Sequence, residues 1–195
     1  YRMRHEEHHD DVLKTRGRLA RVFVEQRRFE DAHDELSEIL ALRREAYGDT
    51  NRRTYDTIAL LGSLESRRGR TAAALAHSDE AIELALRTRQ NPDHPDVGRL
   101  RHARSGVLRA AGRFQESVAA SRVVLESFER TATGPLNHDL LRARIGSANS
   151  LLGMDDDAGA ATQLTALHAA LEDGPQGFAE LATATHHLTA LIAQR

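Results

Sequence analysis

The first candidate for chemistry in this 195-residue chain is a group of imidazoles and carboxylates near its N-terminus. His5, His8 and His9 stand at the helical spacing i, i+3 and i+4, with acidic residues between and after them. Imidazole and carboxylate groups are common ligands of divalent ions such as zinc. Chain termini are usually frayed, however, and His8-His9 also belongs to a linker pattern described below. We therefore predict no metal site here, and no cofactor.

Catalytic motifs are missing from the sequence. No serine lies in a Gly-x-Ser-x-Gly turn, and neither a phosphate loop nor a dinucleotide-binding glycine set is present. The lack of cysteine excludes disulfides, thiolate metal sites and cysteine nucleophiles. The run from Asp155 to Asp157 could be a metal-binding acidic cluster, but helix-start chemistry explains it more simply, because short carboxylates accept hydrogen bonds from unpaired backbone amides. The sequence predicts a protein that is not an enzyme.

A third set of side chains is rich in arginine and could bind an acidic peptide or a phosphate. Guanidinium groups donate paired hydrogen bonds to such anions. The basic members of the set are Lys14, Arg18, Arg21, Arg67, Arg99, His102, Arg109 and Arg144. The alternative interpretation is that they are solvated surface residues paired with nearby acids. Nucleic acid is an unlikely partner for them, because aromatic stacking platforms are missing and the net charge is −2.

The elements that would position this set follow from an internal repeat of 41 to 43 residues, measured between Arg27, Gly69, Gly112 and Gly153. A small residue recurs seven positions before each of these marks and another recurs five positions after it. The two series are Ala20, Gly62, Ser105 and Gly146, and Ala32, Ala74, Ser117 and Ala158. Such a period is typical of stacked helical hairpins. The first helix of each pair then lines a concave groove, which would collect the arginine-rich set.

The repeat predicts an all-α fold, namely an α-solenoid that coils into a right-handed superhelix. We expect a single array over residues 1–195 with about four hairpins and a C-terminal helix. The expected repeats cover approximately residues 8–47, 51–90, 94–132 and 137–173, and the terminal helix covers 177–195. Glycines at the inner turns should adopt a left-handed backbone. Gly62 and Gly146 lie inside helices and should mark close helix contacts, since glycine there costs about 1 kcal/mol relative to alanine.

Two motifs of the third repeat carry a family resemblance. Asp93 to Val97 reads Asp-His-Pro-Asp-Val and opens the repeat, and Gly112-Arg113-Phe114, followed by Ser117, joins its two helices. These motifs resemble tetratricopeptide repeats of the long, kinesin-light-chain type, as found in actinobacterial regulatory proteins. The resemblance extends over roughly residues 8–195. It implies a scaffold that binds a protein or peptide in its groove, as the sensor or scaffold part of a larger bacterial regulatory protein.

The sequence departs from that family pattern in three places. The groove asparagine of the family is replaced by His102 and Ala103, and the basic clamp for a peptide C-terminus is not reproduced. The fourth turn has Met154-Asp155 in place of the basic and aromatic pair, so we expect that hairpin to be irregular.

Two alternative functions stay open. One is self-association through the last helix, whose leucines and isoleucine need cover; they are Leu181, Leu188, Leu191 and Ile192. The other is a receptor for a peptide or small molecule, which would require an enclosed pocket.

The cellular setting is predicted from composition. No apolar run approaches the ~18 residues that span a bilayer, and the N-terminus has no apolar signal core. With a sequence pI near 6.6, no bulk charge draws the molecule to an anionic membrane. We expect a cytoplasmic protein without membrane contact. Because the chain starts at Tyr1 and stops inside a periodic segment, we also expect it to be a fragment of a longer protein.

Overall fold

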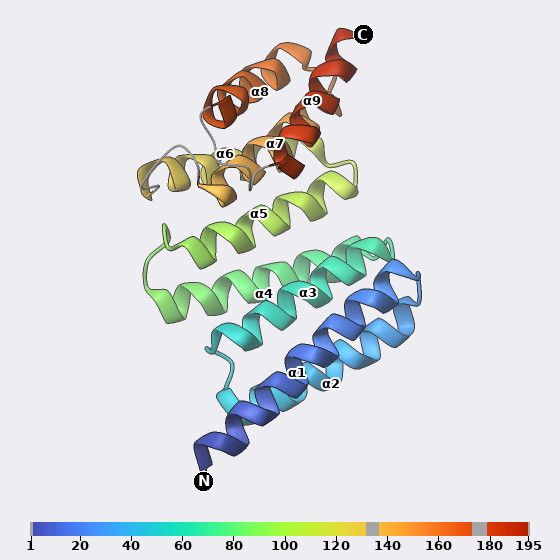
Figure 1. The fold of residues 1–195 in the computed structure, drawn as a ribbon, viewed down its shortest axis with the longest axis vertical. Coiled ribbons are helices and arrows are strands. Elements are labelled where there is room, and N and C mark those ends of the chain that lie inside the picture. The colour runs from blue at the N-terminus through green and yellow to red at the C-terminus, as the bar shows by residue number, and fades with distance from the viewer. Residues whose placement is uncertain (1, 132–136, 173–178, 195) are drawn as a thin grey trace. The chain divides into compact units, whose positions relative to one another are not determined.

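The computed structural model describes the backbone of residues 2–131, 137–172 and 179–194, and the side chains of residues 10–131, 137–171 and 181–194. Over these residues the chain forms nine α-helices and no strand (Figure 1). It divides into two compact units, residues 1–90 and residues 91–195. The prediction of an all-α chain with four hairpins and a C-terminal helix is confirmed.

The first unit contains two hairpins. Its helices are α1 (Arg2–Glu25), α2 (Phe29–Tyr47), α3 (Arg52–Arg67) and α4 (Thr71–Arg89). Each helix packs against the next one along the chain. The small residues of the repeat lie where the helices meet, since Ala20, Ala32 and Ala74 are fully buried. The prediction of a close contact at Gly62 is confirmed, because a Cβ atom there would lie 3.1 Å from the carbonyl oxygen of Ala74 on α4.

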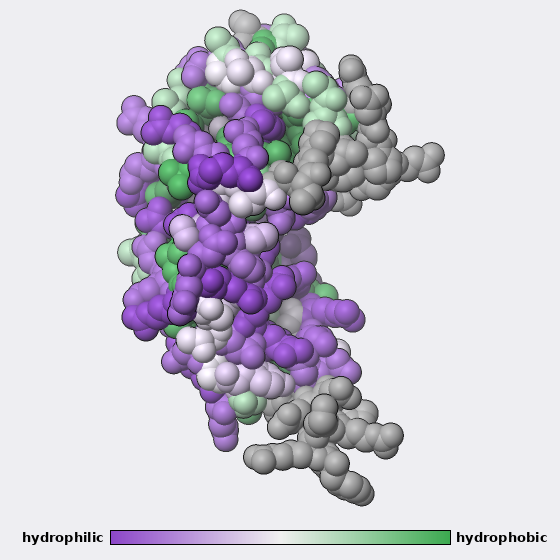
Figure 2. Space-filling view, turned by 90° about the vertical axis from the view of Figure 1, so that its left-hand side faces the viewer, coloured by the Kyte–Doolittle hydropathy of each residue, from purple (hydrophilic) through white to green (hydrophobic). Residues whose placement is uncertain are grey.

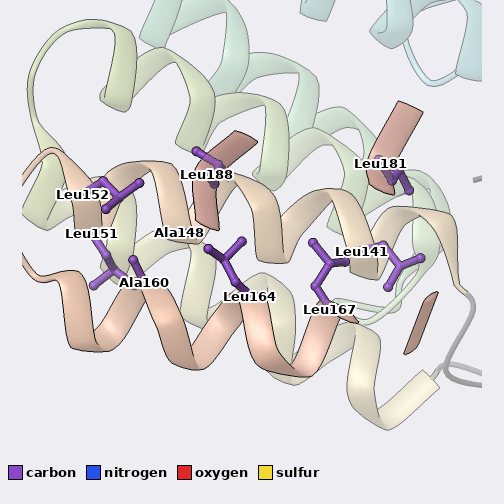
Figure 3. Close-up of a cluster of buried hydrophobic side chains, with 9 residues drawn as sticks. All are labelled: Leu141, Ala148, Leu151, Leu152, Ala160, Leu164, Leu167, Leu181 and Leu188. Carbon is purple, nitrogen blue, oxygen red and sulfur yellow. The ribbon is translucent and has the colours of Figure 1, made fainter. Parts of the chain in front are cut away.

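The second unit contains two hairpins and the last helix. Its helices are α5 (Pro95–Ala110), α6 (Phe114–Thr131), α7 (His138–Leu152), α8 (Asp157–Glu172) and α9 (Ala179–Ala193). An aliphatic cluster joins α7, α8 and α9 (Figure 3). Leu181 and Leu188 of α9 are buried in it. The expectation that these two leucines need an external partner is therefore wrong, because α7 and α8 cover them. Leu191 is exposed.

The inner turns of the first three hairpins end the first helices in the same way. In each of them the mark of the repeat has a positive φ, namely Arg27, Gly69 and Gly112, at 59°, 75° and 73°. The following backbone N–H then donates to a carbonyl five residues back, as Arg113 does to Leu108 over 2.9 Å. This arrangement satisfies carbonyl groups that the helix end would leave unpaired.

The fourth inner turn is shifted by two residues, so its predicted irregularity is confirmed. Gly153, the first residue after α7, keeps a right-handed backbone with a φ of −67°, while Asp155 takes the left-handed conformation at 57°. The expectation of a left-handed glycine here is wrong for a steric reason. A Cβ atom on Gly153 would lie 2.6 Å from the ring of Phe114, so the position is small because the aromatic ring packs on it.

Three of the first helices, α3, α5 and α7, begin with a side-chain cap. The side chains of Asn51, His94 and Asn137 each accept a hydrogen bond from the backbone N–H two residues further on. Such caps satisfy amides that have no partner inside the helix. At the start of α8 the carboxylate of Asp156 accepts from the N–H of Gly159 over 2.9 Å. The helix-start interpretation of the aspartate run is confirmed at this residue.

In the third hairpin the two small positions of the repeat, Ser105 and Ser117, are serines that belong to a buried hydroxyl network. The hydroxyl of Ser105 lies 3.0 Å from that of Ser117 and 2.7 Å from that of Ser121, and Ser117 also lies 2.8 Å from Ser150. All four are fully buried. Because each hydroxyl has a partner, the network avoids the penalty of an unsatisfied buried polar group.

One face of the molecule is largely polar. Figure 2 shows one face on which hydrophilic residues predominate and apolar ones are scattered. Among the helices that the structure describes, none combines the length and the apolar character needed to cross a membrane.

Candidate functional site

A pocket of about 220 Å³ opens between α1 and α3 in the first unit. Its floor is apolar and rigidly placed, because Ala20, Leu36 and Leu64 each expose less than a twentieth of their surface. The complete lining is Ala20, Arg21, Val24 and Glu25 of α1, Leu36 of α2, and Leu60, Ser63, Leu64 and Arg67 of α3. The pocket is therefore built mainly from the first helices of two successive hairpins, as the repeat predicts for a groove.

Charged side chains form the rim of this pocket. Arg67 lies 3.3 Å from Glu25 across the opening, and both side chains are more than half exposed. An exposed ion pair of this kind contributes little to stability, so it can be exchanged for contacts with a ligand at small cost. Arg21 is exposed and forms no ion pair with any residue that the structure describes. The rim thus offers guanidinium groups above an apolar floor.

Lys14 is held by carboxylates of its own helix. Its ammonium nitrogen lies 2.9 Å from Asp10 and 3.2 Å from Asp11. The hydrogen bond to Asp10, followed by the one to Asp11, raises the pKa of Lys14 above its ordinary value. Asp10 is buried and also lies 2.9 Å from Arg53 on α3. Lys14 therefore belongs to a polar contact that links α1 to α3, and it does not line the pocket.

The corresponding region of the second unit lies between α5 and α7 and is filled. His102 and Arg109 of α5 both face Gly146 of α7, where a Cβ atom would lie 3.0 Å from the imidazole and 3.3 Å from the guanidinium. Arg109 donates a hydrogen bond to the carbonyl of Gly146 over 3.3 Å. The predicted close contact at Gly146 is confirmed, and its partners are polar side chains.

Burial controls the charge of these two groups. It lowers the pKa of His102 to about 4, with the neighbouring Arg109 guanidinium as the next cause. The imidazole is thus neutral at pH 7, and its buried Nδ1 has no hydrogen-bond partner among the described residues. Burial also lowers the pKa of Arg109. Both residues serve as packing groups in this structure, with little surface left for a ligand.

The remaining predicted residues do not join either region. Arg144 of α7 lies 2.6 Å from Glu129 of α6 and donates a hydrogen bond to Gln163 of α8. Its guanidinium is therefore directed toward the second helices of the third and fourth hairpins. Arg99 lies 3.8 Å from Asp96 on its own helix. Arg18 is exposed on α1 outside the pocket. Of the eight basic residues in the predicted set, only Arg21 and Arg67 line the pocket together. Whether any of the set binds a ligand stays a prediction.

Metal chemistry finds no support in the described part of the chain, where no three histidine, aspartate or glutamate side chains gather as a metal site. The side chains of His5, His8 and His9 lie outside the described residues.

Sequence reasoning missed the apolar half of the pocket. Leu36 and Leu64 belong to the apolar pattern at helical spacing, which predicts core residues, and Leu60 stands one repeat before Ala103, where the family has its groove asparagine. One feature of the sequence could have indicated that the space between α1 and α3 is open. At the register of His102 and Arg109, α1 has Gly17 and Val24, which are both smaller. A Cβ atom on Gly17 would meet nothing within 4 Å.

Helical hairpins with aligned turns, caps and small contact positions define the chain as an α-solenoid. Two family models described as tetratricopeptide repeat match it, one over residues 12–52 and the other over residues 53–130. The chain belongs to the tetratricopeptide repeat family. No curated protein matches it in sequence.

Solved structures share the fold at low sequence identity. One is the set of nearly identical TPR-like repeats of a candidate kinesin light chain from Podosopora anserina, with a TM-score of 0.74 at 16% identity, covering 94% of this chain and 86% of that one. Another is BtubC (BKLC) from P. vanneervenii, with a TM-score of 0.77 at 17% identity, covering 96% of this chain and 76% of that one. The chain is similar to kinesin-light-chain-like repeat proteins in architecture.

Proposed function

We propose that this chain is a non-catalytic module that binds a protein or peptide, and that the pocket between α1 and α3 receives one apolar side chain of that ligand. The family supports this class of function, because tetratricopeptide repeats commonly serve as scaffolds for protein interactions. The observation that carries the proposal is the pocket itself, with its preformed apolar floor beneath the guanidinium groups of Arg21 and Arg67.

The pocket favours a peptide over a small molecule. Its volume of about 220 Å³ is below the ~300–1,000 Å³ of typical small-molecule sites. A single apolar side chain could fill it, while the rest of an extended or helical ligand lies along the first helices. An aspartate or glutamate next to that apolar residue would meet Arg21, which has no carboxylate partner among the described residues. The ligand class is therefore a peptide with an apolar residue beside an acidic one.

The wider role follows from the resemblance stated above. We propose that the module is the sensor or scaffold part of a larger bacterial regulatory protein in the cytoplasm. Self-association through α9 has less support than peptide binding, because Leu181 and Leu188 are already covered within the chain.

The test uses a random twelve-residue peptide library selected against the complete 195-residue chain. A consensus peptide is then synthesised and its affinity measured by calorimetry. Val24→Arg should fill the pocket, as the arginine at the same register does on α5, and should weaken binding about 10- to 100-fold, the value of one buried apolar side chain. Arg21→Glu should also weaken binding.

Arg122→Glu provides the matched control for charge, because Arg122 is exposed on α6 and far from the pocket in the chain. It should leave the affinity unchanged. Selected peptides that bind Val24→Arg and Arg21→Glu as tightly as the unmodified chain would contradict the pocket assignment.

A further inference from the structure

Among the described residues that line the pocket between α1 and α3, Glu25 is the only acidic one. Its side chain is 73% exposed, so its carboxylate is accessible to a group outside the chain. It shares the rim with Arg21 of the same helix and Arg67 of α3. Charges of both signs therefore lie at the mouth of the pocket, and a ligand that enters meets both.

The repeat shows that stacking of the hairpins does not require these charges. Counting from the turn marks, Glu25 on α1 and Arg67 on α3 occupy the same position. The later first helices have Ala110 and Leu151 there. An ion pair that held successive hairpins together would be expected to recur along the array. At this position of the repeat, charge is found only beside the open pocket.

The two charges on α1 impose a spacing on the groups that bind them. Arg21 and Glu25 are one helical turn apart, so they project from the same side of α1 with about 6 Å between them along the axis. In an extended ligand, residues i and i+2 point to one side and lie about 6.6 Å apart. In a helical ligand, residues i and i+4 lie about 6 Å apart. One acidic and one basic side chain of either kind of ligand thus match the two residues.

The arginines of the rim differ in the partners that they already have. Glu25 lies 3.3 Å from Arg67, whereas Arg21 forms no ion pair with any described residue. An ionised carboxylate has two oxygens, so Glu25 can accept from Arg67 and from an ammonium or guanidinium group of a ligand together. A ligand with acidic residues alone would satisfy Arg21 but would be repelled by Glu25.

We propose that Glu25 is a specificity-determining residue of the pocket and selects ligands with a basic side chain. The ligand then carries an acidic residue for Arg21, a basic residue for Glu25 and an apolar residue for the pocket. The order of the two charges sets the direction in which the ligand lies along α1, because Arg21 precedes Glu25 on the helix. This assignment rests on the proposed function and adds to it a second charge and a direction.

Parallel selections from the library of twelve-residue peptides test this preference. The baits are the complete unmodified chain, Glu25→Lys and Glu45→Lys. Glu45 gives the matched control, because it is exposed on α2 of the same unit and does not line the pocket. Peptides selected on the unmodified chain should carry an acidic and a basic residue two or four positions apart, in a constant order. Glu25→Lys should replace the basic residue by an acidic one, and Glu45→Lys should leave the pattern unchanged.

Calorimetry with one peptide selected on the unmodified chain measures the contact itself. Glu25→Gln should weaken binding of this peptide about two- to fivefold, the value of an exposed ion pair. It should not affect the same peptide with alanine in place of the basic residue. Glu45→Gln should leave both affinities unchanged. Because Glu25 is exposed, its substitution should preserve the fold, and circular dichroism verifies this.

The outcomes separate this assignment from the proposed function. If Val24→Arg weakens binding but the selected peptides lack the basic residue, the pocket binds peptides and the role given to Glu25 is wrong. The same conclusion follows if Glu25→Gln changes the affinities of both peptides equally. If Val24→Arg leaves binding unchanged, the pocket assignment fails, and the role of Glu25 fails with it.

Discussion

The region between α1 and α3 and the region between α5 and α7 occupy the same place in successive pairs of repeats, yet one is open and the other is filled. Gly17 and Val24 stand on α1 where His102 and Arg109 stand on α5. Between α1 and α3 a pocket of about 220 Å³ remains, whereas His102 and Arg109 of α5 contact Gly146 of α7 directly. The two regions have the same arrangement of helices. The side chains that do not repeat decide whether the space can receive a ligand.

The two regions also differ in the burial of their charged groups. Around the open region the charged groups lie at the rim in water, where Arg67 and Glu25 form an exposed pair. In the filled region the charged group is half-buried, and the imidazole beside it is held neutral. The open region is suited to binding, and the filled region ties α5 to α7.

The largest expected effect is the acid sensitivity that His102 contributes in the filled region. The pKa of His102 is about 4 in the folded chain, against 6.5 for an ordinary histidine. The unfolded chain therefore binds more protons between these two values, so stability is complete above pH 6.5 and declines as the pH falls toward 4. The loss amounts to about 3 kcal/mol for one group.

Urea unfolding of the unmodified chain and of His102→Gln, at pH 7 and at pH 4.5, measures this effect. Other titrating groups are common to both proteins, so the difference between their unfolding free energies isolates the imidazole. Parallel losses of stability in the two proteins would contradict the assignment.

A smaller effect is expected from crowding the contact at Gly146. Gly146→Val should destabilise the chain by about 2 kcal/mol, because the added side chain overlaps His102 and Arg109. Gly106→Val is the control, since a Cβ atom there meets only Arg109 at 4.0 Å. Chemical denaturation compares the two. If His102→Ala does not relieve part of the loss in the double variant, the imidazole is not the obstructing group.

The smallest effect should have the opposite sign and should come from the open region. Gly17→Ala is expected to stabilise the chain by about 0.5–1 kcal/mol, because alanine is the better helix former and nothing lies within 4 Å of the new Cβ atom. Gly98→Ala gives the contrast, since its Cβ atom would lie 2.5 Å from Phe128 and should destabilise. Thermal midpoints measure both. A destabilising Gly17→Ala would show that α1 and α3 lie closer than described.

Much of the fold could be predicted because its signals are local. The turn marks, the small contact positions and the helix-start residues each depend on backbone conformation or on close packing over a few residues. The fourth turn shows the limit of this reasoning. Gly153 looked like a left-handed glycine, but its size is required by Phe114, which comes from another helix.

The candidate site was harder to predict. The positions on the first helices were identified from the repeat, but the direction of each side chain was not. Arg144 and Lys14 have the residue type of ligand contacts, but Arg144 pairs with Glu129 of α6 and Lys14 pairs with Asp10 of its own helix. A long, flexible side chain follows its nearest partner, which periodicity alone does not reveal.

By itself, the sequence determined the hairpins, their number and the residues at which the helices meet, because these follow from a period and from small residues at constant phases. The tertiary structure alone decided which space between first helices stays open, that His102 is neutral, and that Val12, Leu19 and Val22 are exposed. These properties depend on burial and on partners from other helices. Their free energies arise only when the hairpins are stacked.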